Sequence, residues 1–215
     1  MNENLFETTY DVTKKSKFRY FYNKYKLLLI SSLSALIIIF IIVFFYTEQQ
    51  HDKKVKLSEN YIDAKIYLSN GDLVSATNIL KEIVLSNDRT YSTLSLFLLL
   101  DENLIKEKKD LSNLFDHLLN NNKFNQEFKN LIIFKRLLLQ SNYANEFEIL
   151  ESAKKLLDSD TVWRAHTLSL LGDYFFSKNE KSKAKDFYTQ ILLLKNISRE
   201  FIEHAQYQLS VIENE

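Results

Sequence analysis

The sequence predicts an all-α protein in which one N-terminal transmembrane helix precedes an α-solenoid of about four helical hairpins plus a capping helix. Residues 27–46 form a run of twenty residues without a charged residue, a Pro or a Gly. Beyond this run, apolar residues recur at helical spacing between short polar breaks. The 215 residues include no Pro and only two Gly, whereas β-sandwiches, β-barrels and Gly-rich nucleotide-binding loops need these residues in number.

The apolar run at residues 27–46 has the length and composition of a membrane-spanning helix. A helix rises about 1.5 Å per residue, so twenty residues cover the roughly 30 Å hydrocarbon core of a bilayer. A buried core helix rarely runs this long without a polar face. A cleaved signal peptide would have a shorter apolar region that ends in a small-residue cleavage site, whereas this run ends in FFYTEQQHD. We therefore predict a retained anchor at 27–46.

The two flanks of the anchor carry unequal positive charge. Residues 1–26 contain six basic side chains, several of them in the aromatic-basic stretch FRYFYNKYK, whereas Lys53, Lys54 and Lys56 follow the run. The positive-inside rule places residues 1–26 in the cytoplasm, with 1–13 as a mobile tail, and residues 47–215 on the outer side. Because the basic excess adjoins the membrane segment, it indicates topology and lipid contact rather than nucleic-acid binding.

Ser31 and Ala35 form a pair of small residues one helical turn apart within the predicted anchor. Small residues let a second helix approach closely in lipid, so this pair is a candidate membrane helix contact. The alternative is that the two are incidental small residues in an apolar span.

Eight polar breaks divide the chain after residue 56 into nine helices of roughly 13–17 residues, and residues 47–56 form a short linker before them. Each break contains Asn, Asp, Ser or Lys, which cap helices and tolerate turns. We predict links of about two to four residues, which force neighbouring helices to be antiparallel. The breaks lie at residues 69–71, 86–88, 106–109, 120–122, 141–142, 159–160, 177–179 and 196–198. Residues 57–215 are therefore predicted to form one domain of helical hairpins.

The last complete hairpin carries the most specific pattern. Its residues at the signature positions are Leu168, Leu171, Gly172, Phe175, Ala184 and Tyr188. This spacing resembles the tetratricopeptide repeat, whose pattern is W-x2-L-G-x2-Y on one helix with small and aromatic positions on the next. We expect Gly172 to let the partner helix pack against bare backbone, and Tyr188 to wedge into the neighbouring hairpin. The closing Pro of the repeat is replaced by Asn196.

The other hairpins follow the same frame less closely. The first has Ala64 in place of the Gly, followed by Tyr67, Ala76 and Leu80, although Asp63 replaces the Leu. Two middle hairpins, at about 90–121 and 125–157, keep only apolar spacing. Their apolar residues include Tyr91, Leu94, Leu98, Leu111 and Phe115 in one, and Leu131, Phe134, Leu138, Phe147 and Leu150 in the other. A final helix over about 199–212 caps the last apolar face. A generic helical bundle is the alternative.

The architecture from about residue 20 to the C-terminus resembles one bacterial family in particular. The stretches that carry the resemblance are FRYFYNKYK before the span, Tyr91-Ser92-Thr93-Leu94 opening a helix, and LLGDYFFSKNEKSKAKDFY in the last repeat. They resemble the YfgM-like ancillary subunits of the SecYEG translocon, single-span inner-membrane proteins with a periplasmic tetratricopeptide-repeat domain. The resemblance implies a bacterial inner-membrane location and transient association with translocon subunits and periplasmic chaperones.

No catalytic or metal-binding motif stands out in the sequence. The four His are isolated, Cys is absent, and no P-loop, nucleophile-elbow or HExxH pattern occurs. The carboxylates are scattered among lysines, as on solvated helix faces. The sequence therefore predicts a non-enzymatic protein with no cofactor, metal or small-molecule substrate. An enzyme with an unrecognised site is the alternative.

The repeat frame places a candidate partner groove on the first helix of each hairpin. Its residues are Tyr61, Lys65 and Leu68 in the first hairpin and His166, Asp173 and Phe176 in the last. Exposed aromatic rings beside charges suit a bound peptide, whereas ordinary packing against the next hairpin is the alternative. Trp163 is expected to pack between hairpins.

The function that these features predict is a membrane-anchored protein–protein interaction module linking SecYEG-type export to periplasmic chaperones. The alternative is a scaffold for envelope assembly or cell division, or one with its repeats in the cytoplasm.

Overall fold

The computed structural model describes residues 14–214, and the side chains of all of these except 14–19, 23 and 29. The predicted mobile tail at 1–13 lies outside the described residues. Every regular element between residues 14 and 214 is a helix, which confirms the predicted all-α class. The chain divides into two units, Met1–Lys56 and Leu57–Glu215.

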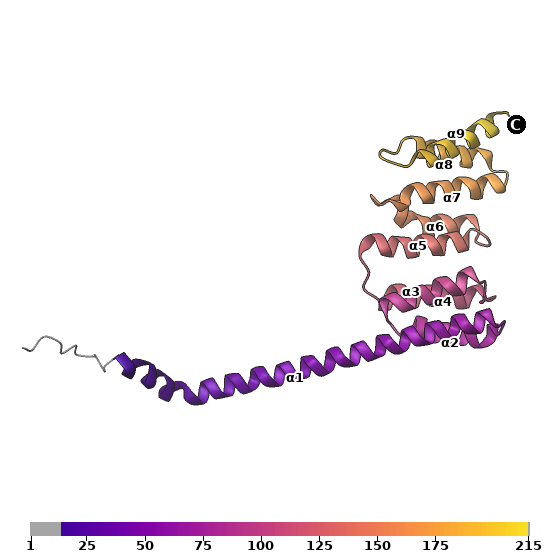
Figure 1. The fold of residues 1–215 in the computed structure, drawn as a ribbon. Helices are drawn as coiled ribbons and strands as arrows, with labels where there is room; N and C mark the ends of the chain where they lie inside the picture. Colours follow the sequence, from indigo (N-terminus) through magenta and orange to yellow (C-terminus); the bar gives the residue numbers. More distant parts are fainter. Residues whose placement is uncertain (1–13, 215) are drawn as a thin grey trace, which may run out of the picture. The chain divides into compact units, whose positions relative to one another are not determined.

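The first helix, α1, covers Lys14–Ser69 without interruption (Figure 1). It contains the whole apolar run and continues through residues 47–56, where the sequence suggested a linker. These ten residues include good helix formers such as Glu48, Gln49 and Lys53 and no Gly or Pro, so nothing in them ends the helix. The part of α1 after residue 56 belongs to the second unit.

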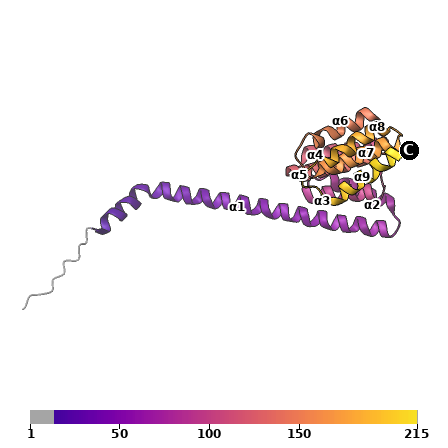
Figure 2. The ribbon, with the colours of Figure 1, turned by 90° about the horizontal axis from the view of Figure 1, so that it is seen from above.

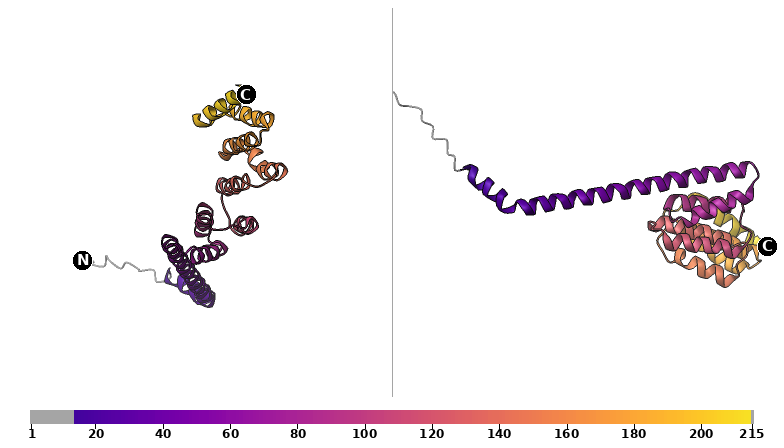
Figure 3. Two further views of the ribbon diagram at one scale, coloured as in Figure 1. Left: turned by 90° about the vertical axis from the view of Figure 1, so that its right-hand side faces the viewer. Right: turned by 90° about the horizontal axis from the view of Figure 1, so that it is seen from below.

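In the second unit, the end of α1 is followed by eight helices in the described part of the chain. They are α2 Leu73–Leu85, α3 Arg89–Asp101, α4 Lys108–Asn121, α5 Gln126–Gln140, α6 Glu146–Leu157, α7 Trp163–Ser177, α8 Lys181–Leu192 and α9 Arg199–Asn214. Figure 1 and the left view of Figure 3 show them layered along a stack, and Figure 2 looks along that stack from one end. The end of α1 and α2–α9 correspond to the nine helices expected from the polar breaks.

Four of the eight links are longer than the two to four residues predicted. The links at 102–107 and 193–198 have six residues, and those at 141–145 and 158–162 have five. Three of these links return apolar side chains to the core, since Ile105 and Ala144 are buried and Leu194 and Ile197 pack against buried residues. Polar residues mark where a helix ends, but a link that also fills the core needs more length.

Polar residues in four of the links cap the helices that follow them. The side chains of Asp72, Asp88 and Asn125 accept hydrogen bonds from backbone N–H groups in the first turns of α2, α3 and α5. Asn145 and Glu148 form a capping box at the start of α6.

Asn takes the role that Gly usually has at the ends of helices. Asn87, Asn103, Asn179 and Asn196 all have positive φ, between 48° and 61°, and Gly71 has a φ of 80°. After Gly, Asn is the residue that most readily adopts this left-handed conformation, because its short side chain bonds locally to the backbone. This substitution explains how a chain with two Gly forms so many tight helix ends.

The second unit has two hydrophobic clusters that meet at α5. The N-terminal cluster runs from Ala64 of α1 to Phe115 and Leu118 of α4, and it includes Ile132 of α5. The C-terminal cluster begins at Leu137 of α5 and extends through α6–α9. From α2 to α9, consecutive helices pack together along the stack, and α2 with α4, α5 with α7 and α7 with α9 also pack together, whereas the backbones of α3 and α5 stay apart.

Most of the signature positions of the first and last hairpins are buried. Nine of them are buried, and the eight other than Gly172 are no more than 1% exposed. The nine are Ala64, Ala76, Leu80, Leu168, Leu171, Gly172, Phe175, Ala184 and Tyr188. The exception is Tyr67, which is 39% exposed although the frame equates it with buried Phe175. The hairpin α5–α6 comes before Phe175 in the chain and contributes side chains to the cluster around it. Tyr67 lies on α1, the first helix of the second unit, so no earlier hairpin covers it.

Three apolar residues of the middle hairpins differ from the burial that their spacing suggests. Leu94 is 42% exposed, Leu138 41% and Phe147 77%. Leu94 and Phe147 line two hollows at the junction between the hydrophobic clusters.

Candidate functional site

The apolar part of α1 has no protein core around it. Every described side chain between residues 27 and 46 is exposed, and the most apolar stretch of eighteen residues in α1 has a mean hydropathy of 3.1. The hydroxyl groups of Ser31 and Ser34 donate to the backbone carbonyls of Leu28 and Ser31, at 3.0 and 2.9 Å, so these polar groups are satisfied within the helix. Helix α1 is therefore long and apolar enough to span a membrane.

Ser31 and Ala35 lie four residues apart on α1, and both are exposed. This spacing puts them on the same face of the helix. Their role as a membrane helix contact stays a prediction.

The residues predicted to form a partner groove lie in separate surroundings. Tyr61 is half-buried, its ring centroid 6.3 Å from that of Tyr91, and its pKa is raised by burial and by the negative charge of Asp101. Lys65 is exposed. Phe176 is half-buried and packs against the C-terminal cluster, while Tyr61 packs against the N-terminal one. They do not form one continuous site.

Four aromatic rings join the first helices of the later hairpins. Phe134 of α5 stacks on Trp163 of α7 with ring centroids 5.5 Å apart, and His166 lies 4.9 Å from Trp163. The ring of Phe201 on α9 meets His166 edge-on at 4.7 Å. Trp163 thus packs between hairpins as expected, and His166 is a packing residue of the cluster. Among the residues that the sequence suggested for an open groove, His166 is thus packed against rings of three helices.

A second contact joins α7, α8 and α9. The hydroxyl of Tyr188 donates to Asp173 Oδ1 at 2.7 Å, and His204 Nε2 lies 3.0 Å from the same oxygen. Burial, together with the bond to Asp173, raises the pKa of Tyr188. A Cβ at Gly172 would lie 2.5 Å from the ring of Tyr188, so the absence of a side chain on α7 makes room for this ring of α8. The two residues belong to the same hairpin. The ring also reaches His204 of α9, the neighbour it was expected to contact.

The first hollow, which we name the α3–α5 hollow, has a volume of about 520 Å³. Its lining residues are Arg89, Thr90, Thr93, Leu94 and Phe97 of α3, Phe124 and Asn125 of the link, and Phe128 of α5. Leu94 and Phe128 are 42% and 37% exposed. The rings of Phe124 and Phe128 lie 5.2 Å apart, so the apolar side chains form one continuous lining.

The charged side chains around the α3–α5 hollow differ in whether they have hydrogen-bond or ion-pair partners. Arg89 is exposed, and no hydrogen bond or ion pair to the described residues engages its guanidinium group. Lys135 lies with its ammonium 5.6 Å from the centroid of the Phe97 ring. By contrast, the carboxylate of Asp88 accepts hydrogen bonds from the N–H groups at the start of α3, and that of Glu127 accepts one from Thr161. Arg89 is the one charged residue among those that line the hollow, so the lining itself carries a positive charge.

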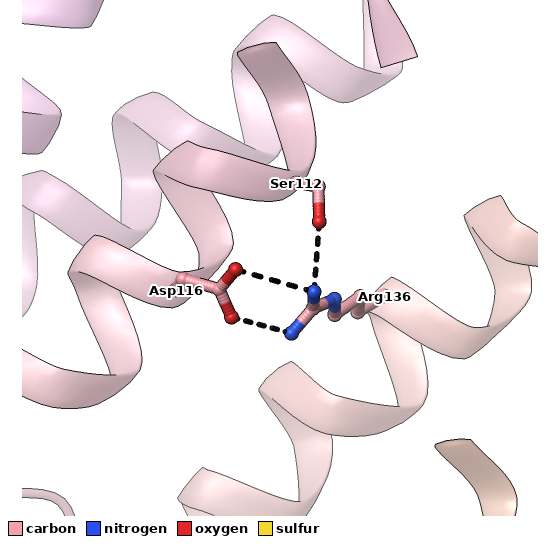
Figure 4. A network of polar contacts seen from close by, with 3 residues as sticks. All are labelled: Ser112, Asp116 and Arg136. Carbon is pink, nitrogen blue, oxygen red and sulfur yellow. Dashed lines mark hydrogen bonds and ion pairs between the residues drawn. The ribbon is translucent and has the colours of Figure 1, made fainter. Parts of the chain in front are cut away.

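A second hollow of about 480 Å³ lies between α4 and α6 and is lined in part by Ser112, Gln140 and Phe147. Beside it, Arg136 of α5 donates to Asp116 Oδ1 and to Ser112 Oγ on α4, both at 2.7 Å (Figure 4). The Nε of Arg136 and the Oε1 of Gln140 are buried without a hydrogen-bond partner in the described structure. The polar contacts between α4 and α5 are therefore incompletely satisfied.

Among the described residues, no three His, Asp or Glu side chains gather in a metal-binding arrangement. The chain matches no family model, no curated protein and no solved structure.

Sequence reasoning missed the α3–α5 hollow. Phe124 and Phe128 are two aromatic residues at helical spacing, and this was the available signal. The sequence alone does not show that Phe124 lies in the link before α5 or that α3 and α5 stay apart.

Proposed function

We propose that the protein is a membrane-anchored, non-enzymatic protein–protein interaction module. The observation that carries the proposal is the exposed apolar segment at residues 27–46, in a helix that continues without a break into the hairpin domain. Exposed side chains this apolar are stable in lipid and unfavourable in water. A stack of hairpins attached to such an anchor presents an extended surface beside the membrane.

We propose further that the hairpins form a tetratricopeptide-like α-solenoid with α9 as its cap. The close fit of Tyr188 over Gly172 and the burial of Ala76 and Ala184 support this, because these are the small and aromatic positions of the repeat. The packing of α5 with α7 and of α7 with α9 is also that of a solenoid. The spacing of α3 from α5 interrupts the regular pattern.

The resemblance to YfgM-like subunits supports a more specific role. In this proposal the N-terminus is cytoplasmic, the hairpin domain lies in the periplasm of a bacterial cell, and the protein links SecYEG-type export to periplasmic chaperones. The six basic residues before the apolar run support the orientation. The partners in this proposal are proteins, and the chain itself catalyses no reaction.

Cross-linking in intact cells tests this function. Photoreactive residues are placed at Ser31 in the apolar segment and at exposed Lys65 on the hairpin domain, with exposed Lys155 as a control on α6. We expect translocon subunits at Ser31 and periplasmic chaperones at Lys65. Adducts only with division or envelope-assembly proteins would replace the export role with the scaffold role. A topology reporter fused after residue 215 that is active in the cytoplasm would overturn the periplasmic proposal.

A further inference from the structure

We propose that the α3–α5 hollow binds a segment of a partner protein that combines apolar side chains with carboxylates. The inference rests on the proposed function in one respect, namely that the protein acts through protein partners. It adds where one partner binds and what chemistry that partner presents.

The hollow has the size and lining of a binding site for a few side chains. Its volume of about 520 Å³ falls within the roughly 300–1,000 Å³ typical of ligand pockets. Leu94 and Phe128 expose apolar surface into it from two different helices, and Phe97 and Phe124 continue the lining. A partner segment would remove this apolar surface from water, so the lining favours aromatic or branched aliphatic side chains.

Later in the stack, the equivalent place is filled by the chain itself. Between α5 and α7, Trp163 stacks on Phe134. At the earlier position, the ring of Phe97 meets the ammonium of Lys135 instead. The α3–α5 hollow thus stays open because the two helices are apart and a charged side chain, rather than an aromatic ring, reaches across.

The charges select an acidic segment. Arg89 at the start of α3 lines the hollow, Lys135 lies over the ring of Phe97, and neither cation is paired with a carboxylate of the described residues. The carboxylates of Asp88 and Glu127 lie outside the lining and accept the hydrogen bonds described above, and Asp101 lies one turn beyond Phe97, where its charge acts on Tyr61. Carboxylates on the partner would complement Arg89 and Lys135, with Arg89 able to bind one by two hydrogen bonds.

The test uses the full-length protein in nanodiscs of zwitterionic phosphatidylcholine. The probe is a fluorescein-labelled peptide in which Phe and Leu alternate with Asp, and binding is measured by fluorescence anisotropy. One matched peptide has Lys in place of every Asp, and a second has Ser in place of every Phe and Leu. We expect only the first peptide to bind, with an affinity that falls as salt is raised.

Variants of the protein then locate the binding. Arg89→Glu combined with Lys135→Glu is expected to weaken binding roughly tenfold or more, because rim charges that attract become repulsive. Leu94→Gln is expected to weaken it roughly fivefold by removing apolar contact. Lys155→Glu and Phe147→Gln are the matched controls, since both residues are exposed away from this hollow, and they are expected to leave affinity unchanged.

Equal binding of the acidic and basic peptides, or unchanged affinity in the Arg89 and Lys135 variant, would overturn the proposal. So would the absence of binding by all three peptides. These outcomes are distinct from failure of the proposed function. Partners cross-linked from Lys65 that are captured equally by the Arg89→Glu/Lys135→Glu variant would leave the function standing and refute this site. If the acidic peptide binds but no partner is cross-linked in cells, the site would stand and the proposed function would be refuted.

Discussion

The two junctions along the hairpin stack are built differently. At the later junction, Gly172 lies under the ring of Tyr188, and aromatic rings join α5, α7 and α9. At the earlier junction, α4 meets α5 through the buried Ile132 and the guanidinium of Arg136, and two hollows lie there. The later junction is closed by aromatic rings, whereas the earlier one combines apolar packing with an ion pair and leaves hollows open.

This difference arises from a few side chains and not from the spacing of apolar residues. Both regions have helices with regular apolar positions. Among the described side chains, four buried polar atoms have no hydrogen-bond partner, and three of them, those of Asn130, Arg136 and Gln140, belong to α5. Helical spacing shows which face of a helix is apolar, whereas closure of a junction also needs a neighbour that fits against that face.

The largest expected effect compares two phenylalanines, one from each region. Phe175→Ala removes a ring that is fully buried in the C-terminal cluster, and we expect it to lower the free energy of unfolding by about 3–5 kcal/mol. Phe147→Ala removes a ring that is 77% exposed, and we expect a change within about 0.5 kcal/mol. Urea unfolding of the full-length protein in detergent micelles, followed by circular dichroism, measures both. Equal losses would show that the two junctions are packed alike.

The next effect tests the close fit at the later junction. Gly172→Ala would place a methyl group against the buried ring of Tyr188, and we expect a loss of about 1–3 kcal/mol despite the better helix propensity of Ala. Adding Tyr188→Leu should make the Gly172→Ala change less costly than it is in the native background, because the ring is gone. A double-mutant cycle by urea unfolding measures this coupling. Additive losses would contradict the contact.

A smaller effect tests the polar junction. Asp116→Ala leaves the half-buried Arg136 without its carboxylate partner, and we expect a loss of about 0.5–1 kcal/mol because the pair is partly exposed to solvent. Arg136→Met removes the charge together with its unpartnered Nε, and we expect a change within about 0.5 kcal/mol. The same unfolding experiment compares them. A larger loss for Arg136→Met would show that the ion pair holds the junction together.

The smallest expected effect concerns the left-handed helix ends. Asn179→Gly relieves the residual strain of a positive φ of 61°, and we expect a gain of roughly 0.5 kcal/mol. Asn179→Ala should lose about 1 kcal/mol, since Ala is strained in this conformation. Asn120→Gly, within α4, is the matched control and should be destabilising by about 1 kcal/mol. Thermal unfolding curves of the three variants measure the differences. A gain at Asn120 would show that backbone conformation is not the cause.

The sequence by itself determined the helices, their number and a segment long and apolar enough to span a membrane. Apolar runs and polar breaks are local properties, and they are enough to place a helix between Asp88 and Asn103 or to identify residues 27–46 as long and apolar enough to cross a bilayer. The burial of Gly172 and Ala184 also followed, because small residues at these positions are needed wherever two helices cross closely.

Only the tertiary structure decided which apolar faces are covered. Leu94, Leu168 and Phe147 all lie at helical spacing, yet Leu168 is buried while the other two line hollows. Whether each of these side chains is buried depends on its distance from the next helix. That distance depends on contacts made by side chains many residues distant in the chain, such as Arg136 at one junction and Tyr188 at the other. Burial is a property of the assembled stack, and the period of the sequence contains no information about the distance between helices.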